Sequence, residues 1–388
     1  MARVFPATPR LILWLPALVS AVFFVTGERI RAQTVLNSAN ALDVPTDAQS
    51  IAMGESFTGV PAYLPAIIYN PAGLAGISGV QASYSYRSQH WLSFLSELDY
   101  HSAALAFSIP LFAVGIFYTR SDLGSADVID RNTLAVIGQV ESHSDMLAIG
   151  FGRSFTPQLS CGITVKGYSE EETTTGGNPG LSYQSYGSFM VDIGALYTVS
   201  GLMGDARFRD IYSAGISLQN FGSDLREQIS LYDAPPSPSV LIRIPRYLRF
   251  GISCSLDILP AEQGGFVPVR IVATGAYRNL LNPSAYQAGD RDVWGWGLEV
   301  SAYELVTLRM GASINGVSSL FGPKGSPMLR YGAGITVPLP RFGASVPLTV
   351  RFDYAAIPVQ HMYLYNPAES KTVLPALTVS AEYAMNVL

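Results

Sequence analysis

The chain has little of what marks most enzymes and cofactor-binding proteins. Of its 388 residues only 14% are charged, two are cysteine and four are histidine. It carries no phosphate-binding loop, dinucleotide fingerprint or metal-spaced cysteine set, so no cofactor is predicted. Beyond the first 32 residues no stretch holds roughly 18 consecutive apolar residues, which excludes a membrane-spanning helix there.

The first 32 residues predict an export signal. Arg3 and Arg10 precede an apolar run over residues 11–25, and a more polar stretch ends at Ala32. The run is short and contains Pro16, which argues against an anchoring helix. Cleavage after Ala32 would remove four arginines and one glutamate and leave a net charge of about −8. This acidity argues against a nucleic-acid partner, which would need a basic surface.

What the chain does have is alternation of apolar and polar residues. Segments of about ten alternating residues, separated by turn-rich stretches, are typical of an outer-membrane barrel. Fourteen such segments lie near residues 79–88, 99–109, 112–120, 144–155, 158–169, 184–198, 207–220, 245–258, 266–279, 292–302, 306–315, 327–338, 346–357 and 374–387. Short and long links alternate between them, as a barrel with tight turns at one end requires.

The fold class expected is therefore an all-β membrane protein, a 14-stranded antiparallel transmembrane β-barrel over residues 79–388. Because the number of strands is even, both termini are expected on the periplasmic side of a bacterial outer membrane. Two of the longer links, residues 120–143 and 221–244, carry apolar residues that a merely solvated loop would not need. Loops of this length are usually functional, so both are predicted to form an outer recognition surface or lid.

Charged residues in the segments lie on the same face of each predicted strand. This face is expected to line the lumen, because a charged side chain that faces lipid near the midplane destabilises the barrel. The predicted lumen-facing charges are Arg87, Lys166, Asp192, Arg249, Arg270, Glu299, Arg309, Arg330, Arg351 and Asp353. A three-residue turn at 303–305 would set Glu299 opposite Arg309. This predicts a structural ion pair inside the barrel, in preference to a ligand site.

Residues 33–78 have no spanning pattern and are predicted to form an N-terminal plug. The segment carries apolar residues such as Ile51, Phe57 and Ile67, and the nearest dry place for them is the lumen. Its end reads as a helical stub, with Asn70 as N-cap and Pro71 at the first helical position. The proposed plug motif consists of Asn70, Pro71, Ala72, Gly73 and Leu74.

The cysteines and histidines suggest no catalytic or metal site. Cys161 and Cys254 lie on apolar strand faces, so two free thiols facing lipid are expected in preference to a disulfide. The histidines fall in or near predicted outer loops without a nucleophile motif, and no enzymatic activity is predicted. A metal cluster of three of them is the weaker alternative. The histidines are His90, His101, His143 and His361, and the cluster would use His90, His101 and His361.

Several motifs resemble those of the PorV/PorQ family and, more distantly, of the FadL family of hydrophobic-compound transporters. The most specific is "AQSIAMGESFTGV" followed by "PAIIYNPAGLAGI", and "VDIGALY", "AGISLQNFG", "IPRYLRFGISCSL", "WGLEVSAYELVTLRMGA", "YGAGITVPLP" and "VRFDYAA" follow in order. The resemblance covers most of the mature chain and implies a FadL-like barrel. The chain departs from the usual pattern at its C-terminus, where Leu388 stands in place of an aromatic residue.

The resemblance implies two functions. As a PorV/PorQ-type protein the chain would be a non-enzymatic accessory to type IX secretion, with secretion components or exported cargo proteins as partners besides membrane lipid. As a FadL-like protein it would pass hydrophobic small molecules. The many charges predicted in the lumen favour the first, because a hydrophobic conduit calls for an apolar lining.

Overall fold

The computed structural model describes residues 42, 45–88, 98–129, 135–175, 181–231, 240–259, 267–282, 292–314, 327–360 and 371–384. These residues belong to one unit, 31–388, whereas the unit 1–30, which holds most of the predicted export signal, lies outside the described residues. Within the described ranges, no helix has both the length and the apolar character that a membrane crossing demands.

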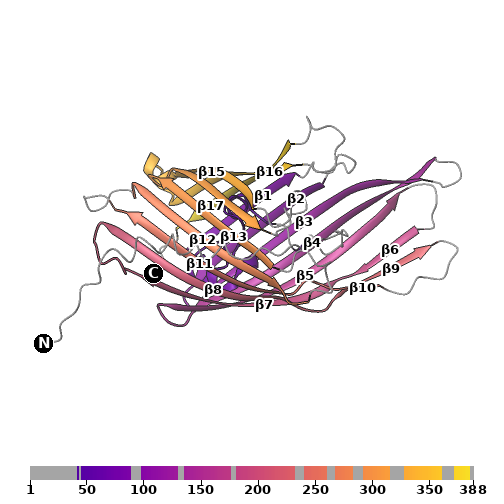
Figure 1. Ribbon diagram of the computed structural model, residues 1–388, viewed down its shortest axis with the longest axis horizontal. Coiled ribbons are helices and arrows are strands. Elements are labelled where there is room, and N and C mark those ends of the chain that lie inside the picture. Colours follow the sequence, from indigo (N-terminus) through magenta and orange to yellow (C-terminus); the bar gives the residue numbers. More distant parts are fainter. Residues whose placement is uncertain are drawn as a thin grey trace. The chain divides into compact units, whose positions relative to one another are not determined.

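Fourteen antiparallel strands close into a barrel in which β17 pairs with β1. Figure 1 shows the arrangement of the wall strands. The predicted fold class is confirmed. The strands are β1 (Val80–Ser88), β2 (Leu98–Ile109), β3 (Phe112–Ile129), β4 (Val136–Ser154), β5 (Leu159–Thr175), β7 (Ser188–Ser200), β8 (Phe208–Gly222), β11 (Tyr247–Ile258), β12 (Val269–Leu280), β13 (Asp292–Ala302), β14 (Val306–Ile314), β15 (Met328–Pro338), β16 (Leu348–Gln360) and β17 (Lys371–Tyr383).

The two faces of the barrel wall differ in character. Outward residues are large and apolar, and many leave over two-fifths of their surface uncovered by protein, as Ile163 (43%), Phe250 (43%) and Tyr331 (49%) do. Inward residues are mostly small, polar or charged and buried, and a few large apolar ones such as Phe117 and Met190 pack in the interior as well. An apolar exterior around a closed wall, with every strand paired on both sides, is what lipid demands of a transmembrane barrel.

The connections divide the barrel into two ends. At the turn end the wall strands are joined by residues 110–111, 155–158, 201–207, 259–268, 303–305 and 339–347. The chain enters β1 and leaves β17 at this end as well. The remaining connections gather at the opposite end, called the loop end below.

Strands β3, β4 and β5 are longer than the predicted segments and extend past their neighbours at the loop end (Figure 1). They hold 18, 19 and 17 residues, whereas roughly 9–11 suffice to cross a bilayer. The prediction of a loop over residues 120–143 was therefore largely wrong, since β3 continues to Ile129 and β4 begins at Val136. The strands continue past the length that a bilayer crossing needs, because neighbouring strands satisfy each other's backbone hydrogen bonds there as well.

A separate three-stranded sheet forms from β6 (Leu181–Tyr186), β9 (Leu225–Leu231) and β10 (Val240–Ile242). It corrects two predictions. Residues 221–244 are not simply a loop, and the predicted strand 184–198 is divided between β6 and the wall strand β7. Gly187 separates the two, and β6 pairs with β9 rather than with a neighbour in the wall.

Residues 45–78, called the lumenal segment below, lie inside the wall. They contain α2 (Ala48–Ala52), α3 (Ala66–Tyr69) and the 3-10 helix η3 (Pro71–Gly76). Helix α2 contacts β14 to β17, and η3 contacts β3, β4, β5 and β7. Side chains from β8, β11 and β12 bond residues in between, so the segment meets the wall on all sides.

Inward glycines let this segment approach the wall at backbone distance. A Cβ atom placed on Gly251 would lie 2.6 Å from the backbone nitrogen of Gly59, and one on Gly311 would lie 2.7 Å from that of Gly54. Similar approaches occur at Gly162, Gly215, Gly295 and Gly297, whereas Gly194 makes room for the Asn70 side chain. Any larger residue at these inward positions would clash with the lumenal segment, which explains why glycines occupy them.

Asn70 fixes the end of the lumenal segment. Its Oδ1 accepts from the backbone N–H of Ala72 (3.2 Å) as the N-cap of η3, and Pro71 occupies the first helical position. Its Nδ2 donates to the carbonyls of Thr58 (2.8 Å) and Ala195 (3.1 Å). One buried amide therefore joins two parts of the segment to strand β7 before the chain enters β1.

Candidate functional site

Two cavities flank the lumenal segment. The smaller, about 40 Å³, lies toward the loop end and is lined by residues such as Arg87, Tyr100 and Lys166. The larger, about 790 Å³, opens toward the turn end. Its floor is the apolar side of the lumenal segment, with Phe57 and Leu64, and its rim is polar and charged.

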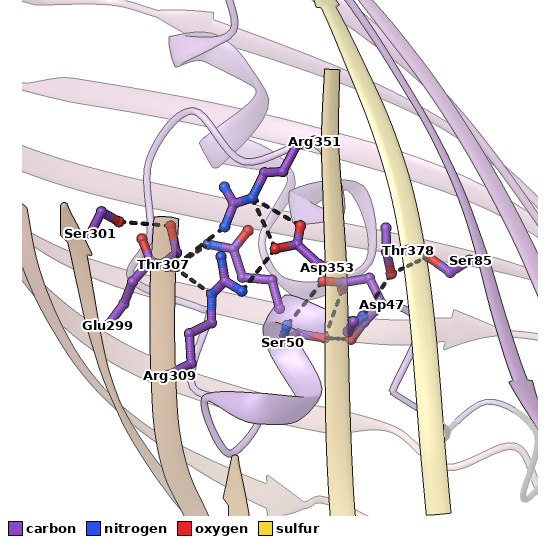
Figure 2. A network of polar contacts seen from close by, with 12 residues as sticks. Asp47, Ser50, Ser85, Glu299, Ser301, Thr307, Arg309, Arg351, Asp353 and Thr378 are labelled. Atoms are coloured by element: carbon purple, nitrogen blue, oxygen red, sulfur yellow. Dashed lines mark hydrogen bonds and ion pairs between the residues drawn. The ribbon is translucent and has the colours of Figure 1, made fainter. Parts of the chain in front are cut away.

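Asp47 lines both cavities, so this residue lies between them. The side chain is buried and caps α2, since Oδ1 accepts from the backbone N–H of Ser50 (2.9 Å) and Oδ2 from the Ser50 hydroxyl (2.7 Å). The Tyr63 hydroxyl donates to Oδ1. Next to it, the backbone N–H of Ala48 donates to Thr378 Oγ1 (2.8 Å), which also contacts the Ser85 hydroxyl (2.8 Å; Figure 2).

The surroundings of Asp47 disfavour its charge. Burial raises the pKa of the Asp47 carboxyl above its usual range, although the hydrogen bonds from Tyr63 and Ser50 act in the opposite direction. The nearby Asp353 carboxylate adds to the increase. A polar group that can hold or lose a proton therefore stands between the two cavities.

Glu299 and Arg309 face each other across the β13–β14 hairpin and are in contact. Arg309 Nε lies 2.6 Å from Glu299 Oε2, and both side chains are buried. Arg309 Nη1 also lies 2.8 Å from Asp353 Oδ1, and Arg351 Nε lies 2.9 Å from Asp353 Oδ2. Figure 2 shows these four side chains meeting next to α2, and Gln49 from that helix donates to Glu299 (3.1 Å). The Glu299–Arg309 ion pair is thus part of a network of charged side chains, and this network also binds the lumenal segment through Gln49.

Glu55 ties the segment to the wall a second time, through Arg330 on β15 at 2.7 Å. Burial acts to raise the pKa of Glu55, but the charges of Arg330, Arg278 and Arg249 outweigh it and hold that pKa below its usual range. Glu55 therefore remains ionised in the interior.

The other predicted lumen charges also face inward, with different partners. Lys166 Nζ lies 2.5 Å from Asp192 Oδ2, at the point where a bulge in β8 interrupts the pairing of β7 and β8. Arg270 pairs with Asp257 (2.6 Å) and is half exposed in the turn-end cavity. Arg249 lies over the Tyr69 ring, 5.5 Å from its centroid.

Sequence reasoning did not find Asp47, Glu55, Tyr63 or Asp257. A signal was available for Asp47, because aspartate directly before "AQSIA" is a typical N-cap. Glu55 and Tyr63 could not be found in this way, since their partners depend on how an irregular segment lies in the lumen.

The cysteines and histidines stay apart from this site. Cys161 and Cys254 are free and lie on outward positions of β5 and β11. His101 contacts the Tyr84 hydroxyl (2.7 Å), and His143 lies 3.5 Å from Asp145 at the loop end. The two other histidines of the proposed cluster, His90 and His361, lie outside the described residues. Across the described ranges, no group of three or more metal-binding side chains is found.

Comparison with known proteins gives no match to a protein-family model and none to a curated protein. Among solved structures the chain is similar to the toluene transporter TbuX of Ralstonia pickettii, at 11% identity and a TM-score of 0.48, over 89% of this chain and 99% of that one. It is also similar to the toluene transporter TodX of Pseudomonas putida, at 10% identity and a TM-score of 0.47, over 88% of this chain and 98% of that one. A FadL homologue of Pseudomonas aeruginosa is similar at 13% identity and a TM-score of 0.43, over 88% of this chain and 99% of that one. At these identities and scores neither substrate nor mechanism passes to this chain, and function rests on its own residues.

Proposed function

We propose that this protein is a non-enzymatic outer-membrane barrel that passes small molecules from one side of its lumenal segment to the other. The observation that carries the proposal is the pair of cavities on opposite sides of that segment, with Asp47 lining both. A barrel whose lumenal segment served only as filling would need no cavity of about 790 Å³ beneath it.

The lining indicates what kind of solute fits. The turn-end cavity combines the apolar floor of Met53, Phe57 and Val60 with charged groups at its rim. Such a surface favours a molecule with both an apolar and a polar part over a bare hydrocarbon, because the buried charges would lose hydration without a polar partner. This supports the transporter alternative of the sequence analysis and narrows it to amphiphilic solutes.

The accessory role in type IX secretion has less support. Its recognition surface was expected on residues 120–143 and 221–244, and much of both forms paired strands. One feature still favours a protein partner, because β3 and β4 project past the barrel and leave Val136 59% exposed. Type IX components or exported cargo recovered with the full chain from solubilised outer membranes would favour this second function.

Replacing Tyr63 with alanine is expected to open a path between the two cavities. The change removes the ring that borders the larger cavity and the hydroxyl that holds Asp47. Release of small carboxylates from proteoliposomes should become roughly tenfold faster than with the wild type, the effect of about 1.4 kcal/mol on a barrier.

The matched control is Tyr331→Ala, which removes the same side chain from the outward face of β15, where it is 49% exposed. This variant should release solute at the wild-type rate. Complete exclusion of every tested solute by both the wild type and Tyr63→Ala would contradict the transport proposal.

A further inference from the structure

Arg87 projects from β1 into the small cavity toward the loop end. It is only 6% exposed, and its guanidinium carbon lies 4.9 Å from the centre of the Tyr100 ring. Stacking on an aromatic face is a common way to orient a guanidinium, but it supplies no counter-charge. Within the described part of the chain no carboxylate forms an ion pair with Arg87, and its Nε has no hydrogen-bond partner.

Other buried cations of the lumen have the carboxylate partner that Arg87 lacks among the described residues. Lys166 contacts Asp192, Arg309 contacts Glu299 and Asp353, and Arg330 contacts Glu55, in each case at ion-pair distance. An unpaired charge in the interior is strongly unfavourable, and removal of one partner from a buried pair has the same consequence. Arg87 therefore has the surroundings of a buried cation that lacks a counter-charge among the residues that the structure describes.

The cavity around Arg87 has the size and the positive charge that an anion needs. Its volume of about 40 Å³ corresponds to about three water molecules, the size of one oxyanion group. The Lys166 ammonium lines it as a second cation and has three hydrogens, of which Asp192 and Asn220 take two. The Ser102 and Thr119 hydroxyls also line it, but they donate to the carbonyls of Thr46 and His101. Two carboxyl groups also reach it: Glu55, which pairs with Arg330, and Asp47, which is hydrogen-bonded by Ser50 and Tyr63.

We propose that this cavity binds a compact oxyanion, a carboxylate or phosphate group, with Arg87 as its charge partner. The anion is either a free ion or the headgroup of an amphiphile. The inference deepens the transport proposal and rests on it where it makes this anion part of the transported solute. Arginine suits the role because its planar fork donates two parallel hydrogen bonds to such groups.

The test compares thermal unfolding of the full chain in neutral detergent with added phosphate, acetate or octanoate. The unfolding temperature of the wild type should rise with the concentration of at least one anion, because only the folded chain binds it. Arg87→Met should lose this rise, or need a concentration roughly tenfold higher or more, as expected for loss of a charged hydrogen bond. Without anion, Arg87→Met should unfold at the wild-type temperature or above it, since it removes an unpaired buried charge.

The control Arg120→Met removes an arginine at the loop end that pairs with Asp122 and Asp145, and it should keep the full anion response. A response to phosphate identifies a free ion, and a stronger response to octanoate than to acetate identifies an amphiphile headgroup. The proposal is overturned if no anion stabilises the wild type, if Arg87→Met responds equally, or if this variant is destabilised without anion. An Arg87-dependent response in a protein that releases no solute would keep the anion site and remove the transport proposal. Solute release without an Arg87-dependent anion response would keep the transport proposal and remove the anion site.

Discussion

Replacing Gly162 with valine is expected to unseat the lumenal segment. A Cβ atom on Gly162 would lie 2.5 Å from the backbone nitrogen of Ala72, and its other near neighbours are backbone atoms of Pro71. Backbone cannot move aside as a flexible side chain can, so the clash should cost about 3 kcal/mol or more. Protease cleavage within residues 45–78 and the unfolding temperature of the folded chain would measure the effect.

Gly167 provides the matched control on the same strand. It faces outward, and a Cβ atom there would meet nothing within 4 Å. Gly167→Val should therefore leave both the unfolding temperature and the protection of the lumenal segment near wild type. Equal protection of the segment in Gly162→Val would show that η3 does not lie against β5.

The second large effect is expected from Arg309→Leu. The change leaves two buried carboxylates, Glu299 and Asp353, without their central cation. Loss of one member of a buried ion network typically lowers the free energy of unfolding by about 3–5 kcal/mol. Glu299→Leu should cost less, because Arg309 keeps Asp353 as a partner.

The double variant Glu299→Leu/Arg309→Leu should be more stable than the sum of the two single effects predicts, since it also removes the Glu299 carboxylate that Arg309→Leu leaves without its partner. Denaturant unfolding of all four proteins in one detergent gives the coupling free energy. Strictly additive single effects would mean that the two residues do not interact.

The barrel itself could be predicted because lipid imposes a simple rule on each strand. Apolar and polar residues must alternate, and this pattern located all fourteen wall strands. The alternation is not required of residues outside the membrane. It could not predict that β3 continues to Ile129, or that residues 225–231 pair with residues 181–186, because pairing in water needs no apolar face.

The candidate site was predictable only where local geometry determined it. A three-residue turn fixes the register of β13 and β14 and so places Glu299 opposite Arg309. The position of Asp47 between two cavities depends on contacts with residues more than three hundred positions away, such as Ala48 with Thr378. No pattern within one segment encodes such a contact. The inward glycines make room for the lumenal segment, and their role likewise depends on how that segment lies against the wall.

The measurement that tests the account most directly is the electrical conductance of single barrels in a planar bilayer. The intact chain should give no large, steady current, because residues 45–78 meet the wall on all sides. A chain that lacks residues 45–77 should give such a current, since a wall of fourteen strands encloses a lumen wide enough to conduct. A large, steady current through the intact chain would contradict the account.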